Sequence, residues 1–210
     1  MTRNSLSNKS GDERGYALVS LILVMSLMAL FALGAAENVR QQSQREREKE
    51  AIFRGEQVAD AIRAYYNYRG AQGVNSLPNS MDDLLQGIPR GTKKLQILRS
   101  EAARDPLSRS GEWKLVGPTS ESVAAFVKDL TVYSGGTPPQ PRMARLASVI
   151  PQMLNVLDTG STSTGRGGED DSADSSGPFL AVTSRSQRNS VMTYYGIDHH
   201  DGWLFTPLFR

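Results

Sequence analysis

The chain has 210 residues, a formal net charge of +2, two histidines and no cysteine. Without cysteine it can form neither disulfides nor thiolate metal sites, and two adjacent histidines leave little material for metal-hydrolase or histidine-based triad chemistry. The small net charge and the scattered arginines do not indicate nucleic-acid binding. Beyond the first 36 residues, the chain has room for one modest domain.

The N-terminal region combines a polar segment with a long apolar one. Residues 1–15 carry three basic side chains against two acidic ones, and residues 16–36 carry no charge. A helix of 21 residues spans about 30 Å, the thickness of the hydrocarbon core of a bilayer. The apolar region of an ordinary signal peptide has only about 7–15 residues. We therefore predict a membrane-spanning helix, with its basic end in the cytoplasm and the rest of the chain facing outward.

The predicted helix continues beyond the apolar segment. Residues 37–69 contain no proline and no loop signal, so one helix of about 80 Å can run from Tyr16 to about Tyr68. Residues 41–50 are polar all round, which predicts a solvated helical surface. Residues spaced three and four apart then predict a face packed against a sheet or another helix: Ile52, Gly55, Val58, Ala59, Ile62, Tyr65 and Tyr66. Gly70 and Gly73 predict that the helix ends near Arg69.

The junction between the polar and apolar segments reads Arg14-Gly15-Tyr16: basic, glycine, aromatic, then apolar. This order resembles the leader junction of type IV pilin-like proteins. The resemblance implies that a prepilin peptidase cleaves between Gly15 and Tyr16 and that the new amine of Tyr16 is N-methylated. An uncleaved signal anchor, in which Gly15 is incidental, fits the short motif as well. The chain also departs from the family, because most pilins place a glutamate where this sequence has Ser20.

A longer run of motifs resembles the pseudopilin-like proteins of type II secretion. The matching segments are residues 45–50 (REREKE), 55–57 (GEQ), the tyrosine pair 65–66, and 78–85 (PNSMDDLL). Two further patterns continue the likeness, "DPxxxxxEWxLV" from Asp105 and "PxxxVxSxS…YxG…WxF" from Pro178. The resemblance covers residues 14–113 and 178–205, and it implies a long helix packed on a small antiparallel sheet.

Several elements are predicted after the long helix. Ser80 can cap a short helix ending at Leu85, with Asp83 as a weak capping-box partner. Asp105 precedes a proline and predicts a turn, and residues 112–116 predict a strand with Trp113 in the core. Ser120 can cap a helix over residues 123–130, and residues 143–157 form another amphipathic candidate, bent at Pro151. Three strands are predicted in a final meander, at residues 178–184, 190–195 and 202–206.

Residues 117–177 read as an insertion to which no task is assigned, and residues 158–178 have the composition of a disordered loop. Four carboxylates within it could bind calcium, although a solvated acidic linker is the commoner explanation and no metal site is predicted: Glu169, Asp170, Asp171 and Asp174. His199 and His200 are expected in a surface or turn role before the last strand.

Together these patterns predict an α+β protein organised as a leader (1–15), a transmembrane half-helix (16–36), an amphipathic helix that begins a pilin-like domain (37–116), an insertion (117–177) and C-terminal strands (178–210). The resemblance implies a structural pseudopilin of a type II secretion or type IV pilus-like assembly, held in the inner membrane with its C-terminal domain in the periplasm or on a filament. Its implied partners are other pilins, a prepilin peptidase, the assembly platform and the lipid bilayer, with no nucleic acid and no cofactor. A membrane-anchored binding or scaffold protein that never polymerises is the alternative. No nucleophile–base pair or phosphate loop can be assembled from these residues, so an enzyme is not expected.

Overall fold

The computed structural model describes residues 12–137, 139–147 and 177–209, without the side chains of residues 12–14, 32–38 and 144. The chain divides into two compact units, Met1–Gln44 and Arg45–Arg210. The predicted leader, residues 1–15, lies mostly outside the described residues. Residues 148–157 of the helix expected at 143–157 also lie outside them. The acidic loop lies outside them except for residues 177–178, so its four candidate calcium ligands are not described.

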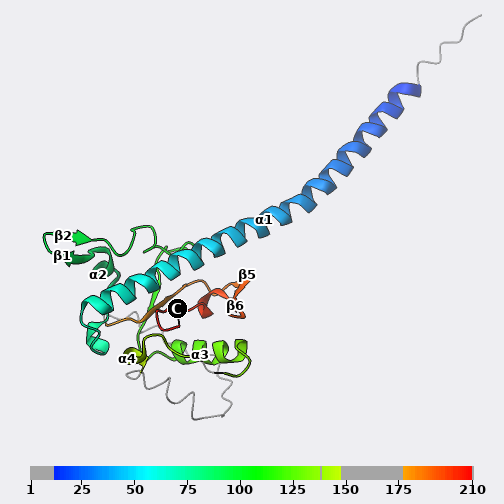
Figure 1. Cartoon of the computed structure of the whole chain (residues 1–210). Helices are drawn as coiled ribbons and strands as arrows, with labels where there is room; N and C mark the ends of the chain where they lie inside the picture. The colour runs from blue at the N-terminus through cyan, green and yellow to red at the C-terminus, as the bar shows by residue number, and fades with distance from the viewer. Residues whose placement is uncertain (1–11, 138, 148–176, 210) are drawn as a thin grey trace, which may run out of the picture. The chain divides into compact units, whose positions relative to one another are not determined.

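The helix α1, Asp12–Tyr68, has 57 residues and passes without a break from the apolar segment into the charged one (Figure 1, blue to cyan). This confirms the predicted continuity of the helix. Its end also lies within one residue of the prediction. The Arg69 N–H donates to the Tyr65 carbonyl at 2.9 Å, and Gly70 then takes a left-handed φ of 89°, which stops the helix.

In the first unit, the apolar side chains of α1 are exposed from Tyr16 to Phe31. Ser20 donates its hydroxyl hydrogen to the Ala17 carbonyl at 2.9 Å, and Ser26 donates to the Ile22 carbonyl at 2.8 Å. Among the residues that the structure describes, no helix meets the length and hydropathy needed to cross a bilayer. The expected span, residues 16–36, lies partly outside them, because the side chains of residues 32–38 are not described.

The described residues of the second unit form short helices and three separate two-stranded antiparallel sheets, so the α+β class is confirmed. The helical elements after α1 are η1 (Val74–Ser76), α2 (Met81–Leu85), α3 (Glu121–Tyr133), α4 (Ala144–Ala147) and η2 (His200–Gly202). The strands are β1 (Ile88–Arg90), β2 (Lys93–Leu95), β3 (Lys114–Val116), β4 (Ala181–Thr183), β5 (Asn189–Tyr194) and β6 (Ile197–His199). They pair as β1–β2, β3–β4 and β5–β6.

The predicted C-terminal meander is wrong in its pairing. The strand β4 pairs with β3 rather than with β5, in the register Leu115↔Val182. The strand β5 instead turns back onto β6, which the sequence did not indicate, through Tyr195 and Gly196 at φ values of 51° and 81°. The segment expected as a third strand, residues 202–206, is not a strand: its first residue belongs to η2, and Phe205 forms an isolated bridge with Val182.

Two predicted helix caps are confirmed. The Ser80 hydroxyl accepts from the Asp83 N–H at 3.3 Å, and the Asp83 carboxylate accepts from the Ser80 N–H at 3.2 Å, which is a full capping box for α2. The Ser120 hydroxyl accepts from the Ser122 N–H at 3.3 Å at the start of α3. Local hydrogen bonding of short side chains therefore specifies where both helices begin.

The core of the second unit lies on the predicted stripe of α1. Val58, Ala59, Ile62 and Tyr66 are buried there, together with aromatic residues of the C-terminal segment, Phe179, Trp203 and Phe205. Trp113 is a core residue, as predicted, and donates its indole N–H to the Ala102 carbonyl at 3.0 Å. In Figure 1, β5 and β6 lie between this half of α1 and α3, and ring contacts from Phe126 and Tyr133 of α3 reach Tyr195 in the β5–β6 turn.

Gly55 allows the ring of Phe205 to approach α1 closely. A Cβ atom built on Gly55 would lie 2.3 Å from Cδ2 of Phe205, inside the ring's van der Waals surface. The aromatic ring therefore packs directly on the helix backbone, which only glycine permits at this position.

We predict that Gly55→Ala destabilises the second unit by about 1–3 kcal/mol, because Phe205 must move out of a packed core. The loss would occur even though alanine favours a helix over glycine by about 1 kcal/mol. Gly117→Ala is the matched control, since its new Cβ would meet only the Pro178 carbonyl oxygen at 3.7 Å. Chemical denaturation of both variants measures the difference, and an unchanged or raised stability of Gly55→Ala would contradict this packing.

Candidate functional site

Glu48 lies on the buried face of α1, with an exposed fraction of 0%. Residues 41–50 are otherwise exposed or half-buried, in line with the predicted solvated surface, so Glu48 is the exception within this run. Removing a carboxylate from water costs several kcal/mol unless hydrogen bonds offset the loss. The structure provides hydrogen-bond partners from the C-terminal segment of the chain.

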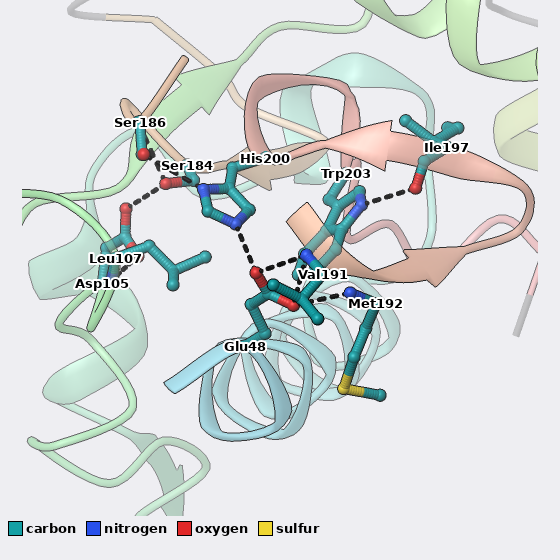
Figure 2. A network of polar contacts seen from close by, with 10 residues as sticks. All are labelled: Glu48, Asp105, Leu107, Ser184, Ser186, Val191, Met192, Ile197, His200 and Trp203. Atoms are coloured by element: carbon teal, nitrogen blue, oxygen red, sulfur yellow. Dashed lines mark hydrogen bonds and ion pairs between the residues drawn. The ribbon is translucent and has the colours of Figure 1, made fainter. Parts of the chain in front are cut away.

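Two consecutive backbone amides of β5 converge on the Glu48 carboxylate (Figure 2). The Val191 N–H lies 2.9 Å from Oε1 and 3.1 Å from Oε2, and the Met192 N–H donates to Oε2 at 2.8 Å. Consecutive N–H groups normally point to opposite edges of a strand. Here the β5–β6 register is irregular between Asn189 and Tyr194, and this irregularity turns both amides toward α1.

The imidazole of His200 is the third partner of Glu48. Its Nε2 lies 3.1 Å from Oε1, and its Nδ1 lies 3.1 Å from the hydroxyl oxygen of Ser186. A carboxylate only accepts hydrogen bonds, so Nε2 carries a hydrogen and donates. Nδ1 is then free to accept from the Ser186 hydroxyl. His200 is only 2% exposed, which corrects the expected surface role; the turn role is confirmed, because His200 begins η2.

A second buried carboxylate continues the network. Ser184 donates its hydroxyl to Oδ2 of Asp105 at 2.7 Å, and Ser184 also accepts from the Ser186 N–H at 3.1 Å. Asp105 accepts the Leu107 N–H at 2.9 Å, which confirms its predicted turn role. The connected groups, drawn in Figure 2, therefore run from the loop at Asp105 through two serines and His200 to α1.

The Ser186 hydroxyl, the His200 imidazole and the Glu48 carboxylate are bonded in the order that nucleophilic enzymes use to activate a serine. This brings together a hydroxyl and a base that the sequence patterns did not connect. In this protein the imidazole is almost fully buried, and both oxygens of the carboxylate accept backbone amides. The arrangement therefore acts as a polar tether that holds β5 and η2 against α1.

The described residues do not assemble a metal centre. No group of three or more His, Asp or Glu side chains among them could hold a metal ion. His199 lies near two single carboxylates, 3.2 Å from Asp198 and 4.0 Å from Asp201, and its side chain is partly exposed.

The predicted processing residues Gly15, Tyr16 and Ser20 all lie on α1 in the first unit. A Cβ atom at Gly15 would have no neighbour within 4 Å, and Tyr16 is 78% exposed. Ser20 bonds to a carbonyl one turn back, as predicted. A larger side chain at Gly15 is therefore compatible with the helix.

The sequence patterns did not predict the burial of Glu48, because a charged residue is normally expected on the solvated face of a helix. It lies four residues before Ile52 and seven before Gly55, so it extends the predicted buried stripe by one turn toward the N-terminus. The periodicity thus contained a signal for its burial. No comparable pattern marks His200 as a partner of Glu48 or Ser184 as a partner of Asp105, because these contacts join residues 152 and 79 positions apart.

Comparison of the chain with protein-family models, with curated proteins and with solved structures found no match. The resemblance of its motifs to pseudopilins therefore stays a prediction.

We predict that Glu48→Gln lowers the free energy of unfolding of the second unit by about 1–3 kcal/mol, because the amide group has one acceptor oxygen and turns its own donor toward the β5 amides or His200. Glu46→Gln is the control, since Glu46 is exposed on the same helix, and its change should stay within about 0.5 kcal/mol. Urea unfolding curves provide both values. Equal stabilities of the two variants would show that the tether contributes nothing.

Proposed function

We propose that this chain is a pilin-like subunit, of the pseudopilin kind, that is inserted in the inner membrane and assembled through its N-terminal helix into a type II secretion or type IV pilus-like structure. The observation that carries the proposal is the two-part character of α1. One part exposes apolar side chains in every direction, and the other supplies the core of a small α+β domain.

The apolar part of α1 is not an amphipathic surface helix. Four consecutive residues, Ile22, Leu23, Val24 and Met25, are exposed by 63%, 61%, 52% and 65%. Consecutive helical side chains point about 100° apart, so these four surround the helix. An apolar surface on all sides needs lipid or other apolar helices around it. A pilin-like subunit meets both environments, first in the membrane and then in a filament.

The longer run of motifs at residues 45–113 and 178–205 favours this class over a plain membrane anchor, which fits the short junction at Gly15 as well. A plain anchor needs the apolar helix but needs no processing site. The order of Arg14, Gly15 and Tyr16 fits a prepilin leader, and the exposed Gly15 leaves the backbone open to a peptidase. Leader processing therefore separates the two candidate functions.

We predict that protein recovered from membranes begins at Tyr16 and carries one added methyl group on its amine, as measured by intact mass and N-terminal analysis. Gly15→Leu should leave the leader attached while the second unit folds normally, because no atom lies within 4 Å of the new Cβ. Retention of Met1 in the natural chain would favour the plain anchor. A start at Glu37 would instead indicate a conventional signal peptide.

A second prediction concerns Ser20, where most pilins carry a glutamate. After cleavage the amine of Tyr16 is a positive charge at the membrane end of the helix, and an unpaired charge in lipid costs a few kcal/mol. The Ser20 hydroxyl is already bonded to Ala17 and carries no compensating charge. We therefore expect no long filaments from this protein alone, and few copies in filaments formed with partners that carry the glutamate.

Ser20→Glu should increase self-assembly, which electron microscopy and sedimentation of membrane extracts would measure. Ser26→Glu is the control, because Ser26 bonds to the helix in a similar way but lies farther from the new amine. Abundant filaments of the unsubstituted chain alone would show that apolar packing is sufficient and that the missing carboxylate is not limiting.

A further inference from the structure

The hairpin β1–β2 and the residues that follow it concentrate positive charge. Residues 86–100 contain no carboxylate and carry four cationic side chains, in a chain whose net charge is only +2: Arg90, Lys93, Lys94 and Arg99. All four side chains are exposed. Within the part of the chain that the structure describes, no carboxylate pairs with any of them. We call these four residues the basic hairpin surface.

The register of the hairpin determines which backbone groups face outward. Residues 91–92 form a two-residue loop, with Arg90 opposite Lys93 and Pro89 opposite Lys94. The residues that flank a two-residue loop exchange hydrogen bonds, and such a bonded pair alternates with an unbonded pair along an antiparallel ladder. Pro89 and Lys94 therefore form an unbonded pair, and their backbone groups point away from the opposite strand.

The two edges of the hairpin differ in what they offer to a further strand. A Cβ atom built on Gly87 would overlap the Leu95 carbonyl oxygen, so this carbonyl faces β1 and the N–H and C=O of Lys94 face the other way. The sheet has only two strands, and among the described residues no other segment bonds to the backbone of Lys94. At the outer edge of β1 stands Pro89, which has no N–H. The edge of β2 is therefore the one that offers both a donor and an acceptor.

The charges on the hairpin select what can pair with this edge. Lysine on an edge strand normally prevents pairing with another copy of the same chain, because two such edges repel each other. Here Arg90 also faces Lys93, and like charges at facing positions destabilise a two-stranded sheet. A strand that carries carboxylates would remove this repulsion. The same side chains thus exclude a basic strand and favour an acidic one.

A cleft of about 340 Å³ continues beyond the end of β2. It is lined by Gln57 and Asp60 of α1 and by residues 96–99, which follow β2 along the chain. Asp60 is paired with Arg63 at 3.2 Å, which compensates its charge. Arg99 lies in the wall of the cleft and is exposed. A segment that pairs with β2 therefore meets one more cation where the strand ends.

We propose that β2 is the docking edge for an extended acidic segment of a partner protein, which adds to the hairpin as a third strand. The main-chain groups of Lys94 bond the incoming strand, and the basic hairpin surface binds its carboxylates. In this mode of recognition the main chain supplies affinity and the side chains supply specificity. The edge belongs to the second unit, so docking does not depend on whether the chain is processed at Gly15.

The test measures peptide binding to the full-length protein in detergent by fluorescence anisotropy. The probe is a short peptide of alternating glutamate and valine, which is acidic and favours an extended conformation. We expect it to bind at least about tenfold more tightly than the same peptide with N-methyl groups on two adjacent central residues, because these groups block main-chain hydrogen bonds on both of its edges. A peptide with lysine in place of glutamate should not bind. Equal binding of the unmodified and N-methylated peptides, or no binding of the acidic peptide, would overturn the proposal.

Two double variants locate the site. Lys93→Gln/Lys94→Gln should weaken binding about fivefold, the effect of losing two exposed ion pairs. Lys114→Gln/Lys128→Gln removes two exposed lysines elsewhere in the same unit and should leave the affinity unchanged. Bound peptide should also slow amide hydrogen exchange across residues 92–96. Equal affinities of the two variants, or binding without this protection, would contradict docking at β2. Flotation with phosphatidylglycerol vesicles that the hairpin variant abolishes, in a protein that does not bind the peptide, would assign the surface to lipid instead.

Discussion

The buried carboxylate of Glu48 is the interaction on which the second unit depends. Its desolvation is offset only when two amides of β5 and the imidazole of His200 are all in place. Apolar contacts tolerate a small slip along a helix, since one aliphatic neighbour can replace another. A carboxylate held by three directed donors does not tolerate it. The polar tether therefore fixes the axial position of the C-terminal strands along α1.

A second contact fixes the same segment two helical turns farther on. Gly55 lies seven residues after Glu48, a rise of about 10.5 Å, and receives the ring of Phe205 directly on its backbone. One contact is polar and directional, and the other is a close steric fit. Since Phe205 and His200 are only five residues apart in the chain, both contacts restrain one short segment at two points. This restrains its position and its direction together.

The sequence predicted the features that depend on residues close together in the chain. The 57-residue helix, its stop at Gly70 and the caps at Ser80 and Ser120 follow from residues within one or two turns of each other. The strand pairing was not predictable in the same way. The strands β3 and β4 are more than 60 residues apart in the chain, and the residue pattern of one strand does not specify which strand pairs with it. The burial of Glu48 could have been inferred from its place on the stripe, but its partners Val191, Met192 and His200 could not.

The β3–β4 pairing determines where the chain can vary in length at low cost in stability. Its two strands enclose residues 117–180, whereas β1–β2 and β5–β6 each close over two residues. The entropy of closing a flexible loop grows only with the logarithm of its length, so doubling the enclosed chain costs about 0.6 kcal/mol. Length variation is therefore cheap between β3 and β4 and expensive in either hairpin. The same long closure makes this pairing the slowest strand contact to form, since its two halves must find each other by diffusion of the intervening chain.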